Sequence, residues 1–91
     1  MKLERQTEVI NRLGLHARAS AKLVKSAGRY ASSIRAGTDS ETVDGKSIMG
    51  LMMLAAGKGS KLTIRTEGPI DAAKKMLVDL EDLFARRFEE V

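Results

Sequence analysis

Segments with strand-like and helix-like hydrophobic periodicity alternate along this chain, and their order limits its possible folds more than any other feature. Alternating apolar and polar residues predict strands over residues 3–10, 32–37, 40–43 and 61–66. Apolar residues at helical spacing predict helices from Ala17 to about Gly28, from Ile48 to about Ala56, and from Pro69 onward. The order β-α-β-β-α-β-α predicts an α+β fold, an open-faced β-sandwich in which three helices cover one face of a four-stranded antiparallel sheet.

Residues that favour turns separate these segments. The turns are predicted at Asn11–Gly14, Gly37-Thr38-Asp39, Asp44-Gly45 and Gly57-Lys58-Gly59. Pro69 is expected at the first helical position, where its missing N–H costs no hydrogen bond. The residues expected to face the core are Leu3 and Val9 in the first strand, Ala17, Ala21, Val24 and Ala27 in the first helix, and Ile70, Ala73, Leu77, Leu80 and Phe84 in the last, with Met76, Leu83 and Phe88 alongside.

The composition excludes several classes of protein. The length of 91 residues leads us to expect one domain over residues 1–91. The absence of cysteine excludes disulfides and thiolate metal sites, and a lone histidine makes a metal centre implausible, so neither metal nor cofactor is expected. The N-terminus lacks the apolar region of a signal peptide, and the longest apolar stretch, around Ile48 to Ala56, is too short to span a bilayer. We therefore expect a cytoplasmic protein that does not bind membranes.

The net charge of +4 suits either an acidic protein partner or nucleic acid. Only Tyr30, Phe84 and Phe88 are aromatic, which is few for a surface that stacks bases. We therefore expect no nucleic-acid binding. A small basic nucleic-acid-binding domain remains the alternative, and the salt dependence of DNA or RNA affinity would test it.

The only histidine, His16, lies where a predicted turn meets a predicted helix, in the segment Gly14-Leu15-His16-Ala17-Arg18. A helix N-terminus presents unpaired N–H groups and partial positive charge, which together favour an anion. The backbone N–H groups of Ala17 and Arg18 could cradle a phosphoryl group, and the Arg18 guanidinium could bind its oxygens. The alternative is an exposed or capping histidine without chemistry.

This segment resembles the active-site signature of the HPr family, the histidine-containing phosphocarriers of the bacterial phosphoenolpyruvate-dependent phosphotransferase system. A second block, from Lys46 to Met52, resembles the regulatory-serine region of the same family. The resemblance implies that His16 accepts a phosphoryl group on Nδ1 from phosphorylated enzyme I and passes it to a histidine of an enzyme IIA protein or domain. It implies that Arg18 neutralises phosphoryl charge, and that the chain is a monomeric carrier rather than a self-sufficient enzyme. Many members have proline where this chain has Ala19, so we expect a slightly looser turn here.

The same resemblance makes Ser47 a candidate for phosphorylation by an HPr kinase/phosphorylase, which would then be a further partner. Taken alone, Ser47 is predicted to be the N-cap of the second helix. The two roles are compatible, because a phosphate at a helix N-terminus is electrostatically favoured.

Two surfaces near these residues are predicted to dock partners. The helix after Ser47 is apolar almost all round, so Ile48, Met49 and Met52 are expected to stay partly exposed. The alternative is that this helix is buried on both sides. Basic residues also recur at helical spacing along the first helix and would form one face of it: Arg18, Lys22, Lys25 and Arg29. This basic face could steer acidic partners, although an ordinary solvated helix face would show the same pattern.

The sequence does not indicate which pathway the chain serves, because sugar uptake and a nitrogen-related branch both use such carriers. The alternative function is a regulatory HPr-like protein of the nitrogen-related branch that acts mainly by protein binding.

Overall fold

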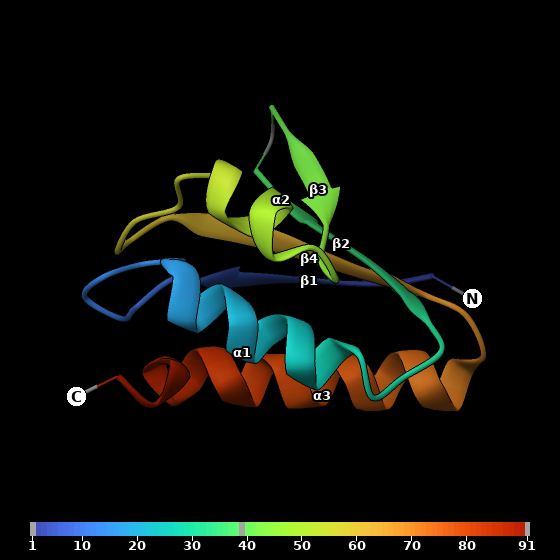
Figure 1. The fold of residues 1–91 in the computed structure, drawn as a ribbon. Coiled ribbons are helices and arrows are strands. Elements are labelled where there is room, and N and C mark those ends of the chain that lie inside the picture. The colour runs from blue at the N-terminus through green and yellow to red at the C-terminus, as the bar shows by residue number, and fades with distance from the viewer. Residues whose placement is uncertain (1, 39, 91) are drawn as a thin grey trace.

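Four strands form one antiparallel sheet in the computed structural model, which describes residues 2–38 and 40–90 (Figure 1). The strands are β1 (Lys2–Glu8), β2 (Ser33–Gly37), β3 (Thr42–Asp44) and β4 (Lys61–Glu67), in the spatial order β1-β4-β2-β3. The helices are α1 (Ala17–Ala27), α2 (Ile48–Met53) and α3 (Ile70–Ala85), followed by a short 3-10 turn η1 (Arg87–Glu89). The predicted element order and fold class are confirmed. Asp39, in the predicted turn after β2, lies outside the described residues.

The two faces of the sheet differ in polarity, as alternation along each strand requires. In β4, Leu62, Ile64 and Thr66 are buried, while Arg65 is exposed. Arg65 pairs with Glu4 of β1 and with Arg35 of β2, so charged side chains from three strands meet on the open face. The apolar face is therefore the one that the helices cover.

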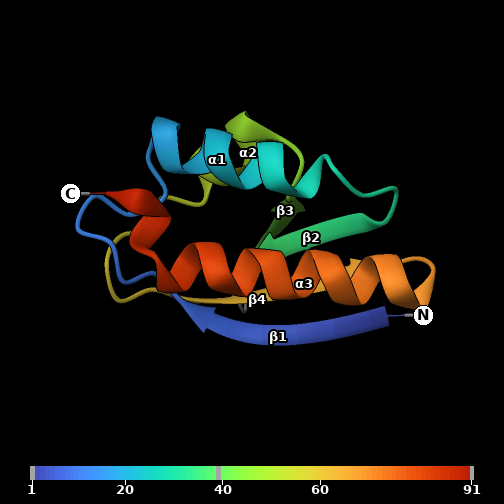
Figure 2. The same cartoon turned by 90° about the horizontal axis from the view of Figure 1, so that it is seen from below.

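α1 and α3 lie side by side against that face, as both views show (Figures 1 and 2). α2 packs against α1 and next to β3. Ile70, at the start of α3, was predicted to face the core but is exposed. None of the helices in the described part of the chain has the length and apolar composition needed to cross a membrane. The largest fully buried apolar side chains of the core are Leu23, Ile34, Leu51, Leu62, Ile64, Met76, Leu80 and Phe84.

The predicted inward face of α1 is confirmed at Ala27 and at the half-buried Val24, but it is wrong at Ala17 and Ala21. Ala17 and Ala21 are exposed, whereas Ala19, Leu23 and Ala27 are buried. Alanines lie on several faces of this helix, so their spacing did not identify the buried one. Leu23 buries far more apolar surface than an alanine, and its position sets the rotation of α1 against the sheet.

Three helix ends, one of α2 and two of α3, also differ from the prediction. α2 stops at Met53, because Leu54 is its C-cap and Ala55 has a left-handed φ of 51°. Pro69 is the N-cap of α3 rather than its first helical residue, with ψ of 137°. Phe88 lies beyond α3 in the η1 turn, where its buried ring meets the edge of Phe84 at a centroid distance of 4.8 Å.

Candidate functional site

His16 is the N-cap of α1, and its ring turns back onto the first turn of its own helix. Its backbone is extended, with φ of −71° and ψ of 179°, and its carbonyl accepts the Ser20 N–H at 2.9 Å. The ring Nδ1 accepts the Arg18 N–H at 3.2 Å. Because a backbone N–H can only donate, Nδ1 carries no proton in this arrangement and keeps its lone pair. The side chain is 29 % exposed, so the ring is accessible from outside.

The turn before His16 is held by backbone and side-chain contacts. Gly14 has φ of 67°, and a Cβ added to it would lie 2.4 Å from the Ala56 carbonyl oxygen. The Leu15 N–H donates to that same oxygen at 2.9 Å, so this close approach ties the turn to the segment after α2. Asn11 Nδ2 donates to the Gly14 carbonyl at 2.8 Å. Glycine is thus required at position 14 for both its φ and its lack of a side chain.

The first turn of α1 leaves donors available next to the ring. The Ala17 N–H has no acceptor among the described residues, and the side chain of Arg18 is exposed and forms no ion pair there. Ala19 is fully buried, and the Ser20–His16 backbone bond closes the turn around it. The looser turn expected from Ala19 stays a prediction.

Of the predicted basic face, Arg18 and Lys25 are exposed on α1, and Arg29 is exposed beyond the end of the helix, but Lys22 is already engaged. Its ammonium donates to the Phe88 carbonyl at 2.9 Å and lies 3.3 Å from Glu89 Oε1. Lys22 therefore ties the middle of α1 to the C-terminal turn, a contact that the sequence did not indicate.

The C-terminal turn also brings a carboxylate to the histidine. Glu90 Oε2 lies 3.3 Å from His16 Nε2, and the C-terminal turn lies near the start of α1 in both views (Figures 1 and 2). The same carboxylate accepts from Asn11 Nδ2 at 2.9 Å and from the Leu13 N–H at 3.1 Å. These donors, the Asn11 amide above all, hold the pKa of Glu90 below its ordinary value against the opposing effect of burial. Asn11 and Glu90 were both missed in the sequence analysis.

The hollow at His16 is small. It measures about 200 Å³ and is lined by His16, Arg18, Lys22, Leu13 and the Phe88–Glu90 turn. Small-molecule sites usually measure about 300–1,000 Å³, so this surface suits contact with another macromolecule better than enclosure of a ligand. Across residues 2–38 and 40–90, no three His, Asp or Glu side chains gather as a metal site.

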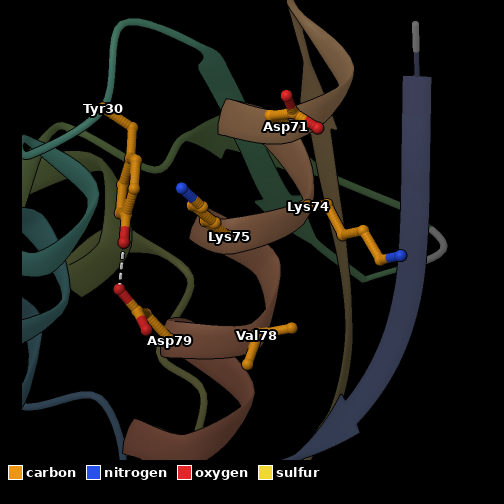
Figure 3. A pocket seen from close by; sticks show the side chains of 6 residues that line it. All are labelled: Tyr30, Asp71, Lys74, Lys75, Val78 and Asp79. Atoms are coloured by element: carbon orange, nitrogen blue, oxygen red, sulfur yellow. Dashed lines mark hydrogen bonds between the residues drawn. The ribbon is translucent and has the colours of Figure 1, made fainter.

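A larger hollow of about 380 Å³ lies elsewhere, between the segment after α1 and the outer side of α3 (Figure 3). Tyr30 crosses it to hydrogen-bond Asp79, which raises the pKa of the tyrosine. None of the residues that line it is a candidate functional residue, so this hollow adds nothing to the site.

Ser47 is the N-cap of α2, as predicted. Its Oγ accepts the Gly50 N–H at 3.0 Å. Ile48, Met49 and Met52 that follow are exposed, Met49 by 72 %, so α2 is not buried on both sides. The Lys46 ammonium donates to the Tyr30 carbonyl at 2.8 Å and anchors the segment before α2 to the segment after α1.

Comparisons with known proteins agree on one family. Residues 3–86 match the family described as the PTS HPr component phosphorylation site. The chain is 50 % identical over 88 residues to the phosphocarrier protein HPr of Cupriavidus necator, covering 97 % of each chain. It is 53 % identical over 83 residues to that of Pseudomonas aeruginosa, covering 90 % of each. The crystal structure of HPr-C-His from Thermoanaerobacter tengcongensis superposes with a TM-score of 0.90 at 34 % identity, covering 98 % of both chains.

Proposed function

Because this chain belongs to the HPr family of phosphocarrier proteins of the phosphotransferase system, we propose that it carries its phosphoryl group on Nδ1 of His16. The donor is phosphorylated enzyme I, and the acceptor is a histidine of an enzyme IIA protein or domain. The observation that carries this proposal is the contact of Nδ1 with the Arg18 N–H at the N-terminus of α1, which leaves the lone pair on Nδ1.

The local geometry suits attack by Nδ1. Its lone pair forms the new N–P bond while the bond between phosphorus and enzyme I breaks and returns its electron pair to enzyme I. The Arg18 N–H, which now donates to Nδ1 at 3.2 Å, loses that acceptor and becomes available to a phosphoryl oxygen. The Ala17 N–H beside it supplies a second donor at the positive end of the helix.

The Arg18 side chain adds a mobile charge to these fixed donors. It is exposed and has no ion-pair partner among the described residues, so it can approach the phosphoryl group without losing another contact. A guanidinium binds two phosphoryl oxygens in one plane, which suits the spread of charge during transfer.

Partners dock, in this proposal, on the exposed surface around α1 and α2. Adaptable apolar contact comes from Ile48, Met49 and Met52. Positive charge comes from Lys25 and from the half-buried Lys22. On this account residues 1–91 act as one HPr-like domain, a cytoplasmic monomer that needs no cofactor and depends on enzyme I for its phosphate.

Ser47 is proposed as the regulatory site, phosphorylated by an HPr kinase/phosphorylase. Its hydroxyl caps α2 and is partly exposed, next to the proposed docking residues Ile48 and Met49. A phosphate there would bring negative charge to the docking surface while the helix N-terminus favours it. The regulatory effect would therefore be on partner binding and not on the fold.

Incubation with phosphoenolpyruvate and enzyme I tests the proposal. The unmodified chain should take up acid-labile phosphate, and a His16→Ala variant should take up none. Equal labelling of the two chains would show that the phosphate is carried elsewhere.

A further inference from the structure

We propose that Glu90 is a positioning residue for His16, which accepts the Nε2–H of the ring and so leaves Nδ1 as the nucleophile. This inference rests on the proposed function, because it assigns a role within phosphoryl transfer. It adds a residue that lies 74 positions from the histidine in the chain.

The two neighbours of the imidazole determine which nitrogen holds its proton. On one side, the Arg18 N–H lies 3.2 Å from Nδ1 and can only donate. On the other side, Glu90 Oε2 lies 3.3 Å from Nε2, and an ionised carboxylate can only accept. Both contacts are satisfied by one tautomer, with the proton on Nε2 and the lone pair on Nδ1.

The carboxylate of Glu90 is itself held in place. Asn11, which is 1 % exposed, donates to Oε2 at 2.9 Å, and the Leu13 N–H donates to Oε1 at 3.1 Å. The side chain of Glu90 is 14 % exposed, so it lies within the surface rather than in solution. The His16 ring, through Nε2, is the third group in contact with this carboxylate.

The backbone around Glu90 is also anchored. The Phe88 ring is buried against Phe84, and the Phe88 carbonyl accepts from the Lys22 ammonium at 2.9 Å. The turn has three successive non-glycine residues at positive φ, Arg87, Phe88 and Glu89. This strained backbone persists because the surrounding contacts hold it, and it aims the next residue at His16.

The electrostatics favour an ionised Glu90. The Asn11 amide, followed by the Leu13 N–H and His16, lowers the pKa of this carboxyl group, outweighing the opposite effect of desolvation. The group is therefore charged at neutral pH, as the role of an obligate acceptor requires.

Glu90 also faces the positive charge that the ring gains when it is phosphorylated. When a neutral ring protonated on Nε2 attacks phosphorus through Nδ1, the product ring carries a positive charge. Glu90 then faces that charge across the Nε2–H bond. When the phosphoryl group leaves, the N–P electron pair returns to Nδ1 and the ring is neutral again. No proton has to move in either step, because the same Nε2–H is kept throughout.

Nuclear magnetic resonance of the imidazole tests the contact directly. At a pH where the ring is neutral, the unmodified chain should show a slowly exchanging His16 Hε2 resonance attached to Nε2, with Nδ1 unprotonated. Glu90→Ala should lose that resonance to solvent exchange. Glu89→Gln, which changes the adjacent carboxylate of the same turn, should keep it. An unchanged Hε2 resonance in Glu90→Ala would overturn the proposal.

Phosphoryl uptake from enzyme I supplies the functional readout. We expect Glu90→Ala to lower the maximal rate by about tenfold, the low end of what losing a partner to a functional histidine costs in metal sites. The carrier concentration at half-maximal rate should stay the same. If only that concentration changed, Glu90 would belong to docking and the positioning role would be wrong.

The outcomes separate this inference from the function on which it rests. If Glu90→Ala took up phosphate normally and His16→Ala took up none, the positioning role of Glu90 would be refuted and the carrier function would stand. Failure of the unmodified chain to take up phosphate would refute both, since the ring would have no transfer to serve.

Discussion

Arg18 stands two residues after His16, and its charge serves the proposed transfer more directly than any other cation of α1. Replacing it by alanine keeps a good helix former but removes the side chain that would meet the phosphoryl oxygens. We expect Arg18→Ala to slow phosphoryl uptake from enzyme I by at least about tenfold. Initial rates of acid-labile labelling measure this.

The matched control for Arg18 is Arg35→Ala, which removes an arginine from the open face of the sheet. It should label at the rate of the unmodified chain. Equal losses in the two variants would mean that overall charge, and not the position of Arg18, sets the rate.

Gly14 shows how one backbone position supports the site. Gly14→Ala introduces a Cβ at φ of 67°, only 2.4 Å from the Ala56 carbonyl oxygen. We expect it to lower the free energy of unfolding by at least about 2 kcal/mol, from left-handed strain and the clash together. Urea denaturation measures the change.

Gly57→Ala is the control for Gly14, because a Cβ there meets nothing within 4 Å and φ is not positive. Its effect should stay within about 0.5 kcal/mol. If Gly14→Ala were equally mild, the turn before His16 would be less constrained than its geometry indicates.

Among the elements, α2 depends most on a single cap, because it spans only Ile48–Met53. Ser47→Ala removes the Oγ that accepts the Gly50 N–H, and we expect it to cost about 1 kcal/mol in the free energy of unfolding. Thermal or urea unfolding measures this.

The matched control for Ser47 is Ser26→Ala, at a half-buried serine inside α1 whose hydroxyl has no hydrogen bond among the described residues. Alanine is the better helix former, so this change should not lower the free energy of unfolding. A Ser47→Ala variant as stable as Ser26→Ala would argue against the cap.

The sequence was sufficient to predict the order and type of these elements, but not all of their faces and ends. Periodicity identified β4 and α3 because their apolar residues are large and regularly spaced. It failed for α1, where Ala17 and Ala21 resemble core residues but only Leu23 buries a large side chain. It also extended α2 past Met53, because Ala55 leaves the helix through a left-handed φ that local propensity does not indicate.

For the molecule as a whole, the docking of the C-terminal turn links stability to pH. The pKa of Glu90 is lowered in the fold, mainly by the Asn11 amide, below its ordinary value in the unfolded chain. Between the two values the unfolded chain binds more protons, so stability rises with pH there. The stabilisation from ionised Glu90 is complete above the pKa that this group has in the unfolded chain. It is lost as the pH falls through the lower pKa that the group has in the folded protein.

Glu90→Gln removes this titration. Urea denaturation over a series of acidic pH values should therefore show a shallower loss of stability for Glu90→Gln than for the unmodified chain. Parallel pH profiles would show that Glu90 is not ionised preferentially in the folded state.

The site as a whole could be predicted only where it is contiguous in sequence. Sequence analysis found His16 and Arg18 at the start of α1 and Ser47 at the start of α2, because each helix start lies within one short segment. Asn11 and Glu90 were not found, since the contact of Glu90 with the ring, and that of Asn11 with Glu90, depend on α3 returning the C-terminal turn to the start of α1. No local pattern at either residue indicates a partner at that distance along the chain.

A chase experiment tests the central claim, that His16 holds a transferable phosphoryl group, most directly. The phosphorylated chain is purified away from enzyme I and phosphoenolpyruvate and then mixed with enzyme IIA. We expect the phosphate to leave His16 and to appear on a histidine of enzyme IIA. Phosphate that stays on the chain, or that lies on a residue other than His16, would contradict it.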